Sequence, residues 1–504
     1  MLMTITVTTE ARANLQADLL LVPLTTDPSR PLVEGLASTL GAPLTRAADD
    51  FSGEKGDTLV VYPDADDAQI RRVALVGLGT PEALDEEALR CGAAGGASVA
   101  QDLDAAVVAC LLPEMTLADA TGAQSLVEGM GLGAYRYPRY KTASAPDALE
   151  TFILHAGDAH DADDVRTGAE TGRILADAAC TARDLVNRPP NEKTARDLAD
   201  AIQTSGHVHD YDVDVWDEPR IRDEGMGGLL AVNQGSVEPP TFSVLTWAPD
   251  DAVNEAPIAL VGKGVVFDTG GLSLKDTKGS MDLMKSDMAG AAAVIGAFEA
   301  LADLEVPLHV VGLVPATDNR PGQNAYVPSD VIRMHSGATV EVMNTDAEGR
   351  LLLADALSYA QSLAPELVID AATLTGSSIV ALGTHAAAVM TSESDDAAER
   401  LYAIQRAGER SGERVHPLPM YDAYKQQLDS NVADLTNVGG RKAGAITAGK
   451  FLEHFTDFPW MHLDMAGPAF LQTAKPYRPT GGTGFGVRLL ATYLRDYVTT
   501  RHQA

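Results

Sequence analysis

Short runs of aliphatic residues alternate with helix-like stretches through the first 160 residues of the chain. Three of these runs, at residues 19–24, 72–79 and 105–112, are apolar at almost every position. Continuous apolar runs of this length are typical of parallel strands buried on both faces, whereas half-exposed strands alternate apolar and polar residues. The pattern therefore predicts an α/β domain at residues 1–160, with a mainly parallel sheet flanked by helices.

The character of the sequence changes near residue 160. Small and acidic residues dominate positions 157–164, and apolar residues then recur at helical spacing from about 165 to 186. Such spacing predicts an amphipathic helix. We place the domain boundary here, with residues 161–504 as the second domain and the helix as the connector.

A second series of strand-like runs follows, separated by helical segments. The runs lie at residues 242–246, 257–261, 308–314, 340–343 and 367–369. Residues 288–304 form the clearest helix, because alanine and apolar residues dominate them, and Asp287 stands where an acid complements the N-terminal helix dipole. A last amphipathic helix is predicted at 487–497. The second domain is therefore also predicted to be α/β, with a mainly parallel sheet flanked by helices.

The charge balance narrows the range of partners. The chain carries 71 acidic and 38 basic residues, a formal net charge of −33, and only 5% aromatic residues. This charge opposes contact with phosphate backbones and anionic lipids, which argues against nucleic acid or a membrane as a partner. Only 11 of the bases are lysines. Because an acid-rich, lysine-poor composition suits high salt, we hypothesise a halophilic source.

Three scattered cysteines, Cys91, Cys110 and Cys180, are too few for a disulfide framework. No basic segment followed by an apolar stretch opens the chain, and no apolar run approaches the roughly 18 residues of a membrane span. We therefore expect a protein of the reducing cytoplasm.

Lysines and acids gather in one segment although lysine is rare elsewhere. Four lysines lie within 23 residues, from Lys263 to Lys285, alongside Asp268 and Asp287. The segment follows an apolar run, and side chains at the carboxyl ends of strands line the ligand crevice of open α/β sheets. We therefore expect this segment to contribute catalytic or ligand-binding residues.

A second cluster, residues 344–350, also follows an apolar run and precedes a helix predicted to begin near Leu351. Its acids, Asp346 and Glu348, would share one side if the backbone stays extended. If the two clusters meet, four carboxylates converge, and like charges in a low dielectric raise each other's pKa. Divalent cations relieve this repulsion, and carboxylate-rich sites with two metals about 3.5–4 Å apart occur in aminopeptidases, phosphatases and nucleases.

The basic residues and the histidines refine this picture. No histidine lies in either cluster and no H-E-x-x-H pair occurs, which excludes that type of zinc protease. Lys263 could ligate a metal only as a neutral amine, which a metal or burial would enforce by lowering its pKa. Lys275 and Arg350 should stay cationic and could bind an oxyanion or another anion.

Five sequence blocks resemble the leucine aminopeptidase family. The most specific is NTDAEGR at 344–350, and the other blocks follow the family's order. They are VGKGVVFDTGGLSLK at 261–275, MKSDMAGAAAV at 284–294, RDLVNRPPN at 183–191 and WMHLDMAGPAF at 460–470. The resemblance spans the second domain and implies that this domain is catalytic, whereas the first domain corresponds to the variable part of the family.

The resemblance also implies a role for each residue. Two ions, Zn²⁺ or Mn²⁺, would be held, one by Lys263, Asp268, Asp287 and Glu348 and the other by Asp268, Asp346 and Glu348. Lys275 would polarise the scissile carbonyl, and Arg350 would anchor a bicarbonate that serves as general base. The substrate pocket would include Met284, Thr373, Leu374, Gly376, Ala466 and Ala469. The implied activity is removal of leucine-like N-terminal residues from peptides with a free N-terminus, by a homohexamer.

Alternatives remain beside this interpretation. A two-metal phosphoesterase would also gather carboxylates, but such sites usually recruit histidines and basic phosphate clamps. A DNA-binding regulatory role beside peptidase activity is opposed by the net charge of −33. Met284 lies at helical spacing from Met288, which is also typical of core residues, and we interpret His462 and Asp464 as structural hydrogen-bonding residues.

Overall fold

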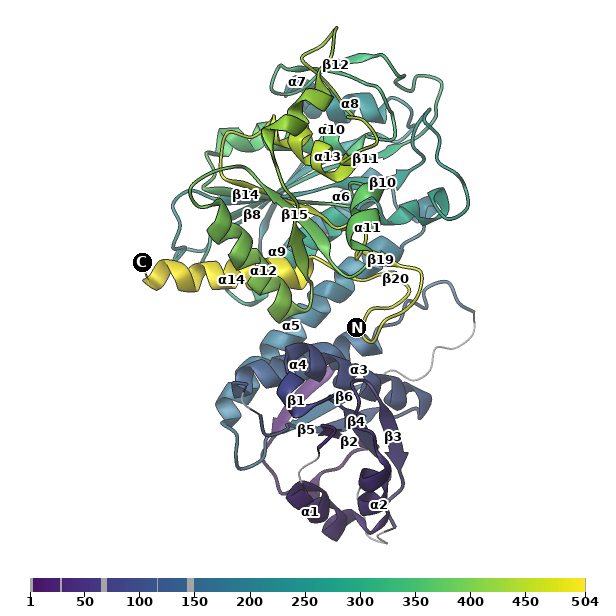
Figure 1. Cartoon of the computed structure of the whole chain (residues 1–504), viewed down its shortest axis with the longest axis vertical. Helices are drawn as coiled ribbons and strands as arrows, with labels where there is room; N and C mark the ends of the chain where they lie inside the picture. The colour runs from purple at the N-terminus through teal and green to yellow at the C-terminus, as the bar shows by residue number, and fades with distance from the viewer. Residues whose placement is uncertain (1–2, 28–29, 65–69, 116, 143–148, 504) are drawn as a thin grey trace. The chain divides into compact units, whose positions relative to one another are not determined.

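The computed structural model describes residues 3–27, 30–64, 70–115, 117–142 and 149–503 (Figure 1). It divides into two compact units. The N-terminal unit holds Met1–Cys180 with Thr473–Thr480, and the C-terminal unit holds Thr181–Gln472 with Gly481–Ala504. Helix α5 (Ala162–Asn187) confirms the helix predicted at 165–186. The division between the two units falls inside this helix. Both units are α/β, as predicted.

The N-terminal unit is built on a six-stranded sheet of order β1-β6-β5-β2-β4-β3, parallel except for the β3–β4 pair. Three strands, β2, β4 and β5, confirm the three predicted apolar runs. The strands are β1 (Thr4–Thr8), β2 (Leu19–Leu24), β3 (Thr58–Val61), β4 (Val73–Gly77), β5 (Val107–Leu111) and β6 (Thr151–His155).

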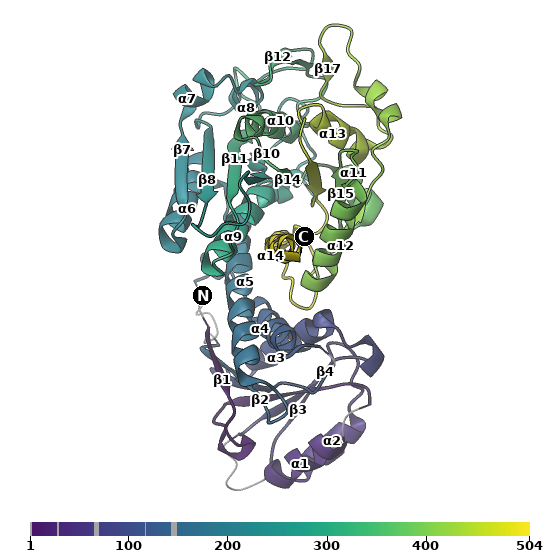
Figure 2. The same cartoon turned by 90° about the vertical axis from the view of Figure 1, so that its left-hand side faces the viewer.

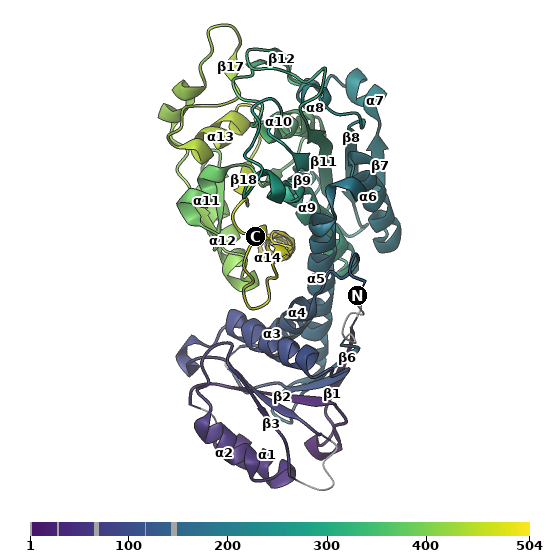
Figure 3. The ribbon, with the colours of Figure 1, turned by 90° about the vertical axis from the view of Figure 1, so that its right-hand side faces the viewer.

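Helices cover both faces of this sheet (Figures 2 and 3). Helices α3 (Glu86–Asp102) and α4 (Asp119–Ala134) lie on one face, and α1 (Arg30–Leu40) and α2 (Pro43–Asp50) lie on the other. Successive residues of β2 alternate between two cores: Leu19 and Leu21 belong to one, Leu20 and Val22 to the other. This double burial explains why the strand is apolar throughout.

The C-terminal unit contains a nine-stranded, mainly parallel sheet of order β16-β15-β18-β14-β9-β11-β8-β7, with β10 paired beside β11. Strand β8 runs antiparallel to β11 and β7, and β15 runs antiparallel to β18. The strands are β7 (Asp212–Trp216), β8 (Thr241–Trp247), β9 (Ile258–Gly262), β10 (Gly264–Asp268), β11 (Val310–Asn319), β14 (Leu367–Ala372), β15 (Ala387–Thr391), β16 (Val415–Pro417) and β18 (Trp460–Asp464).

Two helical layers enclose this sheet (Figure 2). One face carries α6 (Ala195–His209), α9 (Ala289–Asp303), α12 (Ala397–Ser411) and α14 (Val487–Gln503). The opposite face carries α8 (Gly227–Asn233), α10 (Gly349–Ala360) and α13 (Gly444–Glu453). The unit also contains the short helices α7 (Glu218–Asp223) and α11 (Gly376–Leu382).

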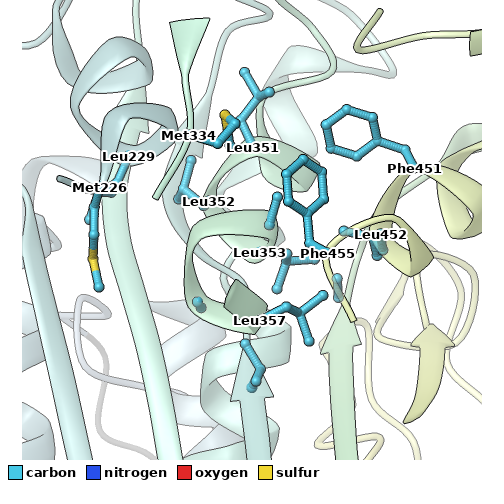
Figure 4. Packing of buried hydrophobic residues seen from close by; sticks show 14 of the residues in the cluster. Met226, Leu229, Met334, Leu351, Leu352, Leu353, Leu357, Phe451, Leu452 and Phe455 are labelled. Carbon is cyan, nitrogen blue, oxygen red and sulfur yellow. The ribbon is translucent and has the colours of Figure 1, made fainter. Parts of the chain in front are cut away.

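Helix α10 is packed by neighbours from both sides. Figure 4 shows Leu351 and Leu352 of α10 near Leu229 of α8, with Phe451 and Phe455 at the α13 side of the same core. Every one of these side chains is at least 99% buried, so the helix has little freedom to shift. This packing fixes the N-terminus of α10, the point where the 344–350 cluster enters the helix.

Some predicted boundaries were wrong. The run at 340–343 does form a strand, β13 (Thr339–Glu341), but it belongs to a separate small sheet with β12 (Val331–Arg333) and β17 (Leu435–Thr436). Helix α10 begins at Gly349 rather than near Leu351, and α14 continues six residues beyond the predicted end at 497. Among the described residues, no helix combines the length and hydropathy needed to cross a membrane.

Candidate active site

A single residue, Lys263, separates β9 from β10. Its backbone N–H donates to the Ala371 carbonyl on β14 (3.1 Å), and its carbonyl accepts from Ala291 N at the start of α9 (3.0 Å). The Lys263 side chain turns toward α10, where a Cβ at Gly349 would collide with it. Gly349 therefore leaves the space that the Lys263 side chain occupies.

Lys263 meets two acids from distant segments. Its Nζ lies 2.8 Å from Asp287 Oδ1 and 2.9 Å from Glu348 Oε1, and it donates to the Thr373 carbonyl at 3.2 Å. Asp287 directly follows the 3₁₀ helix η4 (Met281–Ser286). Although it precedes α9, its side chain does not cap that helix, because Oδ1 accepts from Lys263 and from Thr373 Oγ1 (2.8 Å). A hydrogen-bonded cap therefore does not explain Asp287, although its charge still lies just before the N-terminus of α9, as the helix dipole favours.

The remaining acids lie beside this pair. Asp268 ends β10, Asp346 lies in a turn, and Glu348 immediately precedes α10. Each of these three residues offers a carboxylate oxygen within 4.8 Å of those of the other two. The backbone at 345–346 turns instead of staying extended, so the condition we set for bringing Asp346 and Glu348 together was wrong.

A second lysine stands among the same acids. Lys275 Nζ lies 2.9 Å from Asp268 Oδ2 and 2.5 Å from Asp346 Oδ1. With Lys263, this gives two cations for four carboxylates. The acids are in excess, and Asp268, Asp287 and Glu348 are almost fully buried.

The pKa values reflect this excess. Burial raises the pKa of Asp268 to about 6, with the Glu348 charge adding to the effect. Burial also raises the pKa of Asp287 well above its ordinary value, although Lys263 opposes the shift. For Glu348 the two lysines outweigh burial, and its pKa is lowered. Keeping all four carboxylates ionised in the absence of a metal therefore costs free energy.

Lys263 behaves differently from the sequence-based expectation. Burial acts to lower its pKa, but the charges of Asp287, Glu348 and Asp268 outweigh burial, so the pKa is raised. Burial alone does not make this lysine a neutral amine. Lys275 stays cationic as expected, because the same group of carboxylates raises its pKa as well.

The residues fit a divalent cation. Within the cluster, the buried carboxylate oxygens Asp287 Oδ2 and Glu348 Oε2 have no hydrogen-bond partner among the described residues. Buried charged acceptors without partners are costly, and such groups usually pair with a cation or a metal. Carboxylate oxygens with one amine nitrogen form a donor set that suits Mn²⁺ or Zn²⁺.

Two residues that the sequence reasoning missed join the segments. Asn319, at the carboxyl end of β11, donates from Nδ2 to Asp268 Oδ1 (2.8 Å) and to the Thr345 carbonyl (2.9 Å). Tyr326 donates from its hydroxyl to the same carbonyl at 2.8 Å. Asn319 could have been predicted as a site residue, because it follows an apolar run at the carboxyl end of a strand. No feature of the sequence distinguished Tyr326.

Arg350 follows Glu348 by two residues at the start of α10 and forms no ion pair with the four acids within 4 Å in the described structure. Its Nη1 donates to the Asn437 carbonyl at 2.8 Å, and its buried Nε has no partner among the described residues. Burial lowers its pKa to about 10, so the guanidinium remains charged at neutral pH.

The predicted pocket residues are placed unevenly. Thr373 contacts Asp287, as described above. The backbone N–H groups of Leu374 (3.1 Å) and Ala466 (3.3 Å) both donate to Asp464 Oδ1. Gly376 begins α11 and is exposed, Met284 is half-buried in η4, and Ala469 is 1% exposed. Of these residues, Thr373 contacts Asp287 through its side chain, and the Met284 carbonyl accepts from Asp287 N at 3.2 Å.

The residues interpreted as structural form buried hydrogen bonds. His462 Nδ1 lies 2.5 Å from Asp370 Oδ1, and Asp464 accepts from Thr375 Oγ1 at 2.6 Å. Through the bonds from Leu374 N and Ala466 N, Asp464 fixes the backbone after β14 and after β18. The interpretation of His462 and Asp464 as hydrogen-bonding residues is confirmed.

Family models match both parts of the chain. The model of the cytosol aminopeptidase family, catalytic domain, matches residues 180–491, and the model of its N-terminal domain matches 42–144. The chain belongs to the cytosol aminopeptidase family. All of the site residues described above lie within the catalytic-domain match.

Individual members of the cytosol aminopeptidase family are similar in sequence to this chain over nearly its whole length. A probable cytosol aminopeptidase of Chloroherpeton thalassium is 43% identical over 522 residues, covering 98% of this chain and 100% of the relative. One of Chlorobium luteolum is 45% identical over 517 residues, covering 97% and 99%.

Solved structures extend the similarity to the fold. The bottromycin maturation enzyme BotP in complex with Mn has a TM-score of 0.84 and 34% identity, covering 95% of this chain and 99% of that one. A tomato leucine aminopeptidase variant has a TM-score of 0.87 and 30% identity, covering 98% and 96%. As a member of this metal-dependent cytosol aminopeptidase family, the chain is an aminopeptidase, a hydrolase of peptide bonds. The comparisons support neither a phosphoesterase nor a DNA-binding role.

Proposed function

We propose that this aminopeptidase hydrolyses peptides with two divalent ions held by Lys263, Asp268, Asp287, Asp346 and Glu348. The observation that carries the proposal is the convergence of four carboxylates and one lysine amine, with buried carboxylate oxygens left unpaired. Asp268 and Glu348 would be shared between the ions. Manganese is the metal named with one structural neighbour, and zinc suits the same donors.

When bound, the ions would polarise the scissile carbonyl and activate the attacking water. Lys275 lies between Asp268 and Asp346, and its ammonium would stabilise the oxyanion that develops on the substrate. Arg350 keeps its charge in a buried position, and we assign to it the binding of a bicarbonate that acts as general base. No side chain of the protein then needs to remove the proton.

The substrate would be a peptide with a free N-terminus and a leucine-like first residue. Its amine would bind at the carboxylate cluster, so a blocked amine would lose this anchor. The first side chain would lie against Met284, Thr373, Gly376, Ala466 and Ala469, with the backbone of Leu374 fixing the peptide. Asp464 supports this assignment, because it holds Leu374 and Ala466 on one carboxylate.

Further proposals rest on the family resemblance and the composition. We assign residues 1–160 to the variable N-terminal domain and residues 161–504 to the catalytic domain. The resemblance implies a homohexamer, which light scattering of the purified protein would test. The net charge of −33 and the few lysines support a halophilic source, and the three scattered cysteines support a reducing cytoplasm.

The deciding experiment is hydrolysis of leucine p-nitroanilide with Mn²⁺ or Zn²⁺, before and after treatment with a chelator. We expect the chelator to abolish turnover and added metal to restore it. Glu348→Ala should remove activity, whereas Asp282→Ala should leave it intact, because Asp282 is exposed and its side chain accepts only from Gly279 N among the described residues. Turnover that survives both the chelator and Glu348→Ala would overturn the proposal.

A further inference from the structure

Lys193 is a buried lysine outside the carboxylate cluster. It is 2% exposed, and its Nζ donates to three backbone carbonyls: Leu185 (3.0 Å), Val186 (3.2 Å) and Lys285 (2.6 Å). Among the described residues, no carboxylate lies within ion-pair distance of it. Three acceptors match the three N–H groups of an ammonium.

The location explains how an ammonium can stay there without a carboxylate. Leu185 and Val186 lie in the last turn of α5, where the carbonyls have no helical partner and carry the negative end of the helix dipole. Burial nevertheless lowers the pKa of Lys193 to about 7. Burying a charged amine costs free energy, so we expect Lys193 to have a structural role that an exposed residue could not fill.

The third acceptor shows what Lys193 holds. Lys285 belongs to η4, and two residues later comes Asp287, which contacts Lys263. Lys285 returns the contact, since its Nζ donates to the Asn187 carbonyl at the end of α5 (3.1 Å). Lys193, which belongs to neither segment, therefore bridges the end of α5 and η4, and Lys285 adds a direct bond from η4 to the end of α5.

The same helix end also holds the segment behind the proposed pocket. Asn187 Oδ1 accepts from Gly482 N (2.9 Å), and Arg183 Nε donates to the Thr483 carbonyl (2.9 Å). Thr483 N donates in turn to the Ala469 carbonyl at 3.0 Å. Gly481 has a φ of +101°, and a Cβ there would collide with Asn187 Oδ1.

We propose that Lys193 is a positioning residue that sets the place of Asp287 through η4. The inference rests on the proposed two-metal function and adds to it a residue that contacts neither metal nor substrate. Because partners of metal ligands tune affinity through orientation, losing Lys193 should weaken the binding event that includes Asp287 and spare the other.

The test is calorimetric titration of Mn²⁺ into the chelator-treated full chain, at a temperature where circular dichroism shows each variant folded. Lys193→Met should lower the affinity of one binding event about 10- to 100-fold, the same event that Asp287→Ala removes. At limiting Mn²⁺, kcat with leucine p-nitroanilide should fall while KM changes little, and excess Mn²⁺ should restore part of the rate.

Lys450→Met is the matched control. Lys450 is equally buried at 2% exposure, and its Nζ pairs with Glu453 at 2.8 Å on α13, away from η4. Its loss should lower the unfolding temperature and leave Mn²⁺ affinity unchanged. A lysine of merely structural importance at position 193 would behave in the same way as this control.

Lys285→Met keeps the proposal testable if Lys193→Met does not fold, because Lys285 is only half-buried. Its loss should weaken the same binding event to a smaller extent. Wild-type Mn²⁺ affinity in every folded variant of the two lysines would overturn the inference. A wild-type chain that binds Mn²⁺ but cleaves no peptide would overturn only the proposed function, and one that binds no Mn²⁺ would overturn both.

Discussion

Two lysines of the C-terminal unit are equally buried but have opposite surroundings. Lys263 lies among the carboxylates of Asp287 and Glu348, and its pKa is raised. Lys193 lies among backbone carbonyls, and burial lowers its pKa to about 7. Each is 2% exposed, so the nature of the acceptors, and not the extent of burial, separates them.

The comparison distinguishes the surroundings of a binding-site lysine, Lys263, from those of a structural lysine, Lys193. Around Lys193 every donor of the ammonium has a carbonyl acceptor. Around Lys263 the acids outnumber the lysines, and Asp287 Oδ2 and Glu348 Oε2 stay unpaired in the described structure. A region with matched donors and acceptors favours rigidity, whereas a region with surplus acceptors favours a cation.

The largest effect is expected from Lys263→Met. In chelator-treated protein this change leaves Asp287 and Glu348 buried without their cation, which should cost about 3–5 kcal/mol of unfolding free energy. Lys193→Met leaves only neutral carbonyls unpaired and should cost less, about 1–3 kcal/mol. Urea unfolding of both variants measures the difference. Equal costs would show that the acceptors are not what distinguishes the two sites.

Lys263→Met should also remove peptidase activity that added Mn²⁺ does not restore, because methionine supplies no amine ligand. Lys193→Met, by contrast, should recover part of its rate with excess metal. Assays with leucine p-nitroanilide across Mn²⁺ concentrations separate the two. Full recovery of the Lys263 variant would contradict its assignment as a ligand.

Lys275→Met should separate chemistry from metal binding. Lys275 contacts Asp268 and Asp346, which with Glu348 would hold the second ion. Without this competing ammonium, Mn²⁺ affinity should be unchanged or tighter, while kcat should fall about 10²- to 10³-fold through loss of oxyanion stabilisation. Calorimetry and initial rates on the same preparation give both values. A large drop in Mn²⁺ affinity would place Lys275 among the ligands instead.

The stabilisation by metal should depend on pH. Burial raises the pKa of Asp268 to about 6, against about 4 in an unfolded chain. Between these values the metal-free native state binds more protons than the unfolded state, so its stability falls as pH rises. Metal binding needs the ionised carboxylates, so the rise in melting temperature caused by Mn²⁺ should be larger at pH 7.5 than at pH 5. The Glu348→Ala variant should show little rise at either pH.

More could be predicted from the sequence about the acidic residues of the site than about the hydrogen bonds that hold their backbone in place. Asp268, Asp287 and Glu348 stand in short motifs, and their convergence follows from strand ends and a helix start. The turn at 345–346 depends on bonds from Asn319 and Tyr326 to the Thr345 carbonyl, which no local pattern encodes. Backbone carbonyls have no sequence signature at all, so a lysine bound only to carbonyls resembles any other lysine. Strand β2 was predicted in full because burial on both faces leaves a continuous apolar run.

The smallest effect concerns the surface, where the net charge of −33 resides largely on exposed acids. Salt screens exposed charges but affects buried ones far less, because counter-ions cannot approach them. Raising KCl into the molar range should therefore raise the melting temperature by relieving self-repulsion. The increment from Mn²⁺, which arises at the buried acids around Lys263, should stay nearly constant along the same series. A melting temperature that is flat or falls with KCl would remove the support for a high-salt protein. An Mn²⁺ increment that shrinks in parallel with KCl would show that the carboxylate cluster is more open to solvent than its burial indicates.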